Sequence, residues 1–118
     1  MSKIITAAIA AAFAKQGDTS EKEAKDIKII LKLFGGPMTV YIYDQDWSDP
    51  EKDGYWAFVD LGDPICAECG YVSLSELMAL KIPPFGLPLE HDRFYEGETL
   101  AEVEARYDKI RQRMYANQ

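Results

Sequence analysis

The sequence predicts an α+β fold, in which a small antiparallel sheet of three to four strands carries an N-terminal, a short central and a C-terminal helix on one face. Short segments between residues 27 and 72 alternate apolar with polar side chains, which is typical of half-buried strands. Two capping boxes, starting at Ser73 and Thr99, mark the beginnings of helices. The 118 residues, 47% of them hydrophobic, are enough for one core, so we expect residues 1–118 to form a single domain.

The first helix is expected over residues 1–15, with Ser2 as its cap. Its apolar residues recur at the spacing of one helical face: Ile4, Ile5, Ala8, Ile9, Ala12 and Phe13. Lys3 followed by an apolar run also resembles a weak signal peptide, but the run is rich in alanine and lacks leucine, which favours the helix. On this interpretation the protein is cytoplasmic, with reduced thiols. No apolar run approaches the roughly 20 residues that span a bilayer, so we expect no membrane association.

A β-meander is expected over residues 27–72. Strands are predicted at 28–34, 38–44 and 55–61, with a Gly-Gly-Pro turn after the first and a long acidic turn after the second. Val40 and Ile42 alternate with Tyr41 and Tyr43, which predicts one buried face for the second strand. Residues 65–72 form either a short fourth strand or an ordered loop.

The C-terminal part is expected to contain a short helix at 73–81, a loop and extended segment at 82–98, and a helix at 99–115. The IPPFGLP sequence at 82–88 favours an irregular, rigid loop, because proline donates no backbone hydrogen bond. The last helix carries a stripe at a/d spacing, formed by Leu100, Val103, Tyr107, Ile110 and Met114. This stripe is either a core face or a homodimer seam; two heptads are short for an autonomous coiled coil, which favours the core.

The acidic charge is concentrated between residues 44 and 68. This stretch has eight acidic residues and one basic residue, Lys52, so it accounts for the whole formal net charge of −7. A compact acidic face flanked by tryptophans is suited to a basic partner. The predicted contact surface consists of Asp44, Asp46, Trp47, Asp49, Glu51, Asp53 and Trp56. The alternative is a solvated acidic turn that protects strand edges from aggregation.

Cys66 and Cys69 form a Cys-x-x-Cys pair, which is half of a zinc site. His91 with a carboxylate from Glu68 or Asp92 would be needed to complete it, and a single pair is a weak signal. Two ordinary thiols are the favoured interpretation, so we expect neither a metal nor another cofactor.

Acidic and basic groups also gather at residues 90–93, where Glu90 and Asp92 flank His91. Such a histidine can titrate near neutral pH and act in acid–base chemistry. In a strand, however, Glu90 and Asp92 face one side and His91 the other, which favours salt bridges and capping over catalysis.

Two blocks of the sequence, GYVSLSELMAL and FGLPLEHDRFY, resemble an uncharacterised family of small proteins carried by plasmids, phages and other bacterial mobile elements. Proteins of that family have a pattern similar to GYFSLSEL followed by GLPIERDLYF. The matching positions are Glu68, Gly70, Tyr71, Ser73, Leu74, Ser75, Glu76 and Leu77, then Gly86, Leu87, Pro88, Glu90 and Asp92. The resemblance covers about residues 27–97. His91 stands where the pattern has arginine, Tyr41 and Tyr43 replace a tryptophan-rich strand, and the cysteine pair is not part of the pattern.

The resemblance implies a mobile-element setting, often near functions that counter host defences, and no settled activity. With the localised acidity, it leads to the expectation of a non-enzymatic DNA-mimic protein. It would inhibit a host nucleic-acid-handling complex, of anti-restriction or anti-CRISPR type, by occupying a basic surface. The partner is then a host protein or nucleoprotein complex rather than nucleic acid itself, because phosphate binding is driven by lysine and arginine.

Two other functions stay open. One is a small-ligand or nucleotide-binding module with a pocket between the sheet and the IPPFGLP loop, contacted by Glu68, Glu90, His91 and Asp92. The other is a hydrolase that uses Glu90, His91 and Asp92.

Overall fold

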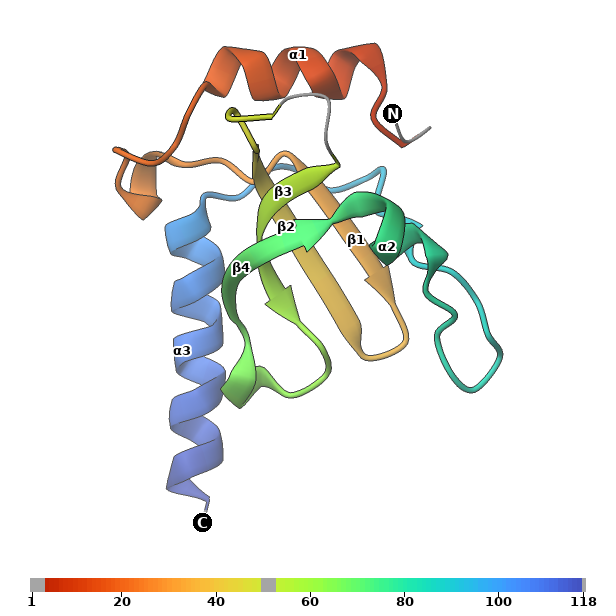
Figure 1. Cartoon of the computed structure of the whole chain (residues 1–118). Helices are drawn as coiled ribbons and strands as arrows, with labels where there is room; N and C mark the ends of the chain where they lie inside the picture. Colours follow the sequence, from red (N-terminus) through yellow and green to blue (C-terminus); the bar gives the residue numbers. More distant parts are fainter. Residues whose placement is uncertain (1–3, 50–52, 118) are drawn as a thin grey trace.

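The computed structural model describes residues 4–49 and 53–117, which form an α+β fold around one antiparallel sheet (Figure 1). The strands are β1 (Leu31–Gly35), β2 (Met38–Gln45), β3 (Gly54–Asp60), β4 (Glu68–Ser73) and β5 (Glu90–His91). The helices are α1 (Ala7–Gln16), α2 (Leu74–Ala79) and α3 (Leu100–Ala116), with short 3₁₀ turns at Ala24–Asp26 and Pro64–Cys66. No helix in these two described ranges is long and apolar enough to cross a membrane.

The sheet has five strands, in the order β4-β3-β2-β1-β5, where three to four were expected. Residues 65–72, expected to form either a short fourth strand or an ordered loop, contain a 3₁₀ turn followed by strand β4. The additional strand is β5, whose two residues pair antiparallel with β1: His91 lies opposite Leu33, and Glu90 opposite Phe34. A two-residue strand has no periodicity that a sequence pattern can reveal, which explains why it was missed.

The helices cover both faces of the sheet, so the expectation that they share one face is wrong. On one face, Phe13 of α1 and Leu74 of α2 pack with Val40 and other apolar strand residues. On the other face, Val103 and Tyr107 of α3 pack with a second cluster of strand residues. In Figure 1, α1 lies across the top of the sheet and α3 runs down its left side.

Strand β2 is correspondingly buried on both faces, not on one. Val40 and Ile42 belong to the α1 side, while Tyr41 and Tyr43 belong to the α3 side. The tyrosine rings are large and apolar, and Tyr41 makes an edge-to-face contact with Tyr107 at 6.3 Å between centroids. The side chains of β2 therefore alternate between two buried faces of the sheet.

Helix α1 begins at Ala7 rather than at the first residue, and Ser2 lies outside the described residues. Thr6 is the cap: its Oγ1 accepts a hydrogen bond from the amide of Ile9 at 3.2 Å. The predicted apolar face is largely confirmed, because Phe13 is fully buried and Ile4, Ile5 and Ile9 pack beside it.

The two predicted capping boxes have different outcomes. The box at α3 is complete: Thr99 accepts from the Glu102 amide, and Glu102 accepts from the Thr99 amide, each at 3.1 Å. At α2, Ser73 caps the helix, but Asp53 rather than Glu76 supplies the carboxylate, which accepts from the Ser73 hydroxyl at 3.0 Å. A carboxylate from the start of β3 thereby ties this helix to the sheet.

The a/d stripe of α3 is largely a core face. Leu100, Val103 and Tyr107 are buried against the protein's own sheet, whereas Met114 is exposed. Only the last turns of the stripe are left for contact with another chain, so a homodimer through this helix would use a short seam.

Candidate functional site

The acidic stretch does not form one face, because two of its members are inside the protein. Asp44 is 3% exposed and Asp60 is 8% exposed. Asp60 accepts hydrogen bonds from the Tyr107 hydroxyl at 2.7 Å and the Gly62 amide at 2.8 Å. These carboxylates stabilise the fold, and neither is available for contact with a partner.

The other acids lie at two ends of the sheet. Asp46, Asp49 and Asp53 precede β3, whereas Asp63 and Glu68 follow it. Seven residues of strand separate the groups, which is a span of roughly 20 Å at about 3.3 Å per residue. The predicted compact acidic face is therefore corrected to two smaller groups, and Glu51 lies outside the described residues.

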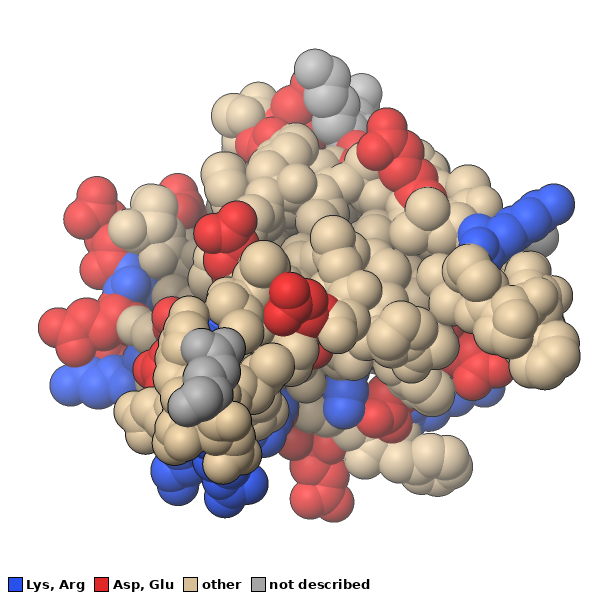
Figure 2. Space-filling view, turned by 90° about the horizontal axis from the view of Figure 1, so that it is seen from below, with Lys and Arg blue, Asp and Glu red and all other residues tan. Residues whose placement is uncertain are grey.

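The group that follows β3 lies toward the end of the molecule away from α1. Figure 2 shows that end: acidic residues are scattered among uncharged ones, with lysines and arginines around the rim. The group that precedes β3 has a different surrounding, since one of its members, Asp46, lines a cavity.

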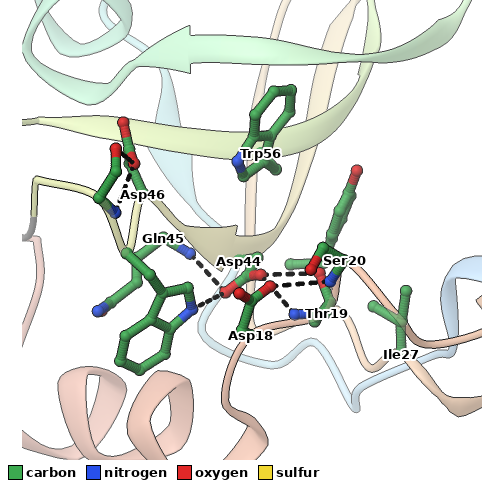
Figure 3. Close-up of a pocket in the computed structure, with 11 residues that line it drawn as sticks. Asp18, Thr19, Ser20, Ile27, Asp44, Gln45, Asp46 and Trp56 are labelled. Atoms are coloured by element: carbon green, nitrogen blue, oxygen red, sulfur yellow. Dashed lines mark hydrogen bonds between the residues drawn. The ribbon is translucent and has the colours of Figure 1, made fainter.

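This cavity has a volume of about 480 Å³ and opens between the β2–β3 turn and the segment after α1 (Figure 3). It lies where the α3-side face of the sheet ends, so Ile27 and Tyr43 of that core form part of its wall. The other lining residues are Asp18, Thr19, Ser20, Asp44, Gln45, Asp46, Trp47, Ser48 and Trp56. Figure 3 shows Trp56 above Asp18 and Asp44, which both line the cavity.

Asp44 holds the two sides of the cavity together. Its Oδ2 accepts hydrogen bonds from the Thr19 hydroxyl at 2.7 Å and the Thr19 amide at 2.9 Å. Its Oδ1 accepts from the Gln45 amide and from Nε1 of Trp47, both at 2.9 Å. Four donors saturate a carboxylate, so Asp44 is a structural latch rather than the contact residue that the sequence suggested.

Both tryptophans of the cavity are held in place while remaining partly exposed, at 39% for Trp47 and 43% for Trp56. The bond to Asp44 fixes the Trp47 ring. Trp56 makes an edge-to-face contact with Tyr71 at 5.1 Å between centroids. The Tyr71 hydroxyl in turn donates to Asp46 Oδ2 at 2.8 Å.

Gly54 leaves the space that Tyr71 occupies. A Cβ at position 54 would lie 1.6 Å from the Tyr71 hydroxyl oxygen. Any other residue at this position therefore displaces Tyr71 and weakens its contacts with Trp56 and Asp46. A glycine at the start of β3 thus leaves Tyr71 in place beside Trp56, which lines the cavity.

Two carboxylates, exposed Asp18 and partly exposed Asp46, give the cavity its charge. Hydrogen bonds from Ser20 lower the pKa of Asp18, and hydrogen bonds from Ser48 and Tyr71 lower the pKa of Asp46. Both groups are consequently ionised at neutral pH. No lysine, arginine or histidine is among the described residues that line the cavity.

The residues of the predicted small-ligand pocket are not brought together. Glu68 is on β4 and Glu90 on β5, which are opposite edges of the sheet. Four strand spacings separate them, which is about 19 Å. Asp92 instead forms an ion pair with Lys32 at 3.7 Å and accepts from the Phe94 amide, as the capping interpretation expected.

The same separation keeps the weak candidate zinc ligands apart, because Cys69 is on β4 and His91 on β5. Among the described residues, no group of three or more His, Cys, Asp or Glu side chains is arranged to hold a metal ion. Both cysteines are exposed. Burial and the nearby Arg93 lower the pKa of His91, so this histidine is neutral at pH 7.

The part of the cavity formed by residues 18–20 was not found from the sequence, where these residues lie between the expected first helix (1–15) and the expected β-meander (27–72). The available signal was the short Asp-Thr-Ser run, whose side chains readily accept or donate hydrogen bonds to nearby backbone. Nothing in the sequence showed that Thr19 would bond to Asp44, 25 residues away.

The fold and the cavity define a small α+β protein with an acidic, tryptophan-walled pocket at one end of its sheet. A family model described as "Protein of unknown function (DUF2958)" matches residues 4–112, so the chain belongs to this family. The resemblance to an uncharacterised family is thereby confirmed, and the match is longer than residues 27–97. Neither a curated protein nor a solved structure matches the chain.

Proposed function

We propose that this protein is a non-enzymatic binding protein that attaches to the basic surface of a nucleic-acid-handling complex. The observation that carries the proposal is the acidic pocket, where ionised Asp18 and Asp46 stand beside partly exposed Trp47 and Trp56. Partly exposed tryptophans are frequent binding hot spots. Carboxylates at the rim increase the association rate with a positively charged partner.

The charge of the pocket argues for a protein partner rather than nucleic acid. The net charge of −7 and the carboxylates at the pocket repel phosphate groups. A surface that normally holds DNA or RNA is positively charged, so it attracts this end of the protein. The proposed effect is inhibition by competition, which weakens as salt screens the charges.

The biological setting is proposed from the sequence pattern. The SLSEL and GLP blocks of the chain are similar to proteins of plasmids, phages and other mobile elements. A protein of such an element that blocks restriction or CRISPR complexes would protect the element on entry into a host. The proposed target class is therefore a host defence complex in the cytoplasm.

A small-ligand-binding module is the second candidate, favoured by the volume of the cavity. About 480 Å³ lies within the roughly 300–1,000 Å³ of ordinary ligand pockets. The ligand would bind beside Trp56, not between the sheet and the IPPFGLP loop. A thermal-shift screen tests this candidate: stabilisation by cationic metabolites supports it, and a flat response removes it.

Affinity capture from a bacterial lysate, with and without nuclease, tests the leading proposal. The expected result is a nucleic-acid-binding complex that stays attached after nuclease treatment and loses DNA binding when the protein is added. The matched variants are Asp18→Asn with Asp46→Asn at the pocket, and Glu90→Gln with Glu96→Gln elsewhere. Each pair removes two negative charges from exposed or partly exposed positions. Equal capture and inhibition by both pairs would show that the pocket is not the contact site.

A further inference from the structure

The pocket contains more chemical detail than a generally acidic surface. Aromatic rings of Tyr43, Trp47 and Trp56 line it together with the carboxylates of Asp18 and Asp46. We propose that it receives one arginine side chain from an exposed basic segment of the partner. This inference rests on the proposed function and specifies the group that the site recognises.

The lining selects a cation. The face of an indole ring carries partial negative charge and attracts a cation within about 6 Å of its centroid. Asp18 and Asp46 add full negative charges, since hydrogen bonds from neighbouring residues lower the pKa of both. With no basic side chain among the described lining residues, a phosphate or carboxylate ligand would find no counter-charge there.

Among cations, the geometry favours arginine over lysine. A guanidinium group is planar, so it stacks on an aromatic ring while its edge donates parallel hydrogen bonds to a carboxylate. Figure 3 shows Trp56 above Asp18 and Asp44, with Asp46 to one side, so ring and carboxylates approach the cavity from different directions. An ammonium group is a more strongly hydrated point charge and uses the ring face less well.

The site is organised before anything binds. The Asp44 carboxylate fixes the Trp47 ring, and Tyr71, bonded to Asp46, packs against Trp56. A binding partner therefore does not have to order these two rings, which reduces the entropic cost of association. Asp18 is exposed, and its Oδ1 accepts a hydrogen bond from the Ser20 amide at 2.9 Å.

Titration of the full chain with short end-blocked peptides tests the proposal. The probes are Gly-Gly-Arg-Gly-Gly and its lysine and citrulline counterparts; citrulline keeps the shape of arginine but carries no charge. Binding is followed by tryptophan fluorescence and by the NMR signals of the two indole N–H groups. The arginine peptide is expected to shift both indole signals, with binding by the lysine peptide several-fold weaker and no response to citrulline.

Two variants locate the binding. Asp18→Asn with Asp46→Asn should weaken arginine-peptide binding by about tenfold or more, whereas the control pair Glu90→Gln with Glu96→Gln should leave it unchanged. Trp56→Leu should also weaken it, and its circular dichroism spectrum checks that the fold is kept. The proposal would be overturned if the arginine peptide gave no saturable response up to about 10 mM. A dissociation constant above that concentration is too weak to matter in an interface.

The other outcomes are equally decisive. Equal binding of arginine and citrulline, or unchanged binding by the Asp18 and Asp46 variant, would overturn the proposed site. If no arginine peptide binds but the complex is still captured, the inference fails and the proposed function stands. If the peptide binds as expected but no complex is captured, the proposed function fails and the arginine site stands.

Discussion

Asp44→Asn should destabilise the protein more than neutralising any exposed aspartate of the pocket. The substitution keeps the shape of the side chain but replaces one acceptor oxygen with an NH₂ group. The buried carboxylate accepts four hydrogen bonds, and the NH₂ group would face two of the donors from Thr19, Gln45 or Trp47. Two donors then lose a carboxylate oxygen as their acceptor, in a site where Asp44 is only 3% exposed.

The size of the effect follows from these contacts. Each hydrogen bond to a charged group contributes about 1.5–3 kcal/mol, so the loss of two costs about 3–6 kcal/mol. That is a large share of the roughly 5–15 kcal/mol that stabilises a domain. With an m-value of about 1.5 kcal/mol/M, the urea midpoint should fall by about 2 M or more.

Urea unfolding at pH 7, followed by tryptophan fluorescence and circular dichroism, is the assay. Asp18→Asn is the matched control, because its carboxylate is exposed, and it should change the free energy of unfolding by less than about 0.5 kcal/mol. Thr19→Val removes one of the same hydrogen bonds, so its effect should not add to that of Asp44→Asn. A urea midpoint for Asp44→Asn within about 0.3 M of the wild type would refute the claim that Asp44 holds the two sides of the cavity together.

Three further predictions concern the two cores and the contacts around α3. Leu33→Ala, at a fully buried position of β1, should lower the free energy of unfolding by about 2–5 kcal/mol in urea titrations. Tyr107→Phe removes the donor to buried Asp60 and should cost about 1–3 kcal/mol in the same assay. The Arg106 guanidinium beside Glu98 lowers the pKa of that carboxyl. The ionised Glu98 therefore stabilises the folded state above pH about 4.3, and this stabilisation is lost as the pH falls through the lower folded-state pKa. Stability measured between pH 6 and pH 2 should therefore fall less steeply in Arg106→Gln than in the wild type; parallel curves would contradict this.

Elements with strong local signals could be predicted from the sequence. The alternation in β2, the glycine turn after β1 and the capping box at Thr99 each depend on residues close together in the chain. The structure accordingly confirms these elements to within a few residues. Element types at long, periodic segments are the part of a fold that local patterns specify best.

Features that depend on distant pairing could not be predicted. Strand β5 exists because residues 90 and 91 meet β1, and Asp44 is buried because Thr19 reaches it. Trp47, Trp56 and Asp46, which the sequence pattern grouped in one predicted contact surface, all line the same cavity. The sequence pattern placed Asp44 on the contact surface although it is buried, because charge summed along a chain does not say which carboxylates are buried.

The most direct test of the central claim is competition between this protein and DNA for a purified target complex. The account predicts that wild-type protein and the Glu90→Gln, Glu96→Gln control displace DNA equally well, in a salt-sensitive manner. It predicts that the Asp18→Asn, Asp46→Asn variant displaces DNA about tenfold less effectively at the same net charge. Equal displacement by the two double variants would contradict the claim that this pocket binds the basic partner.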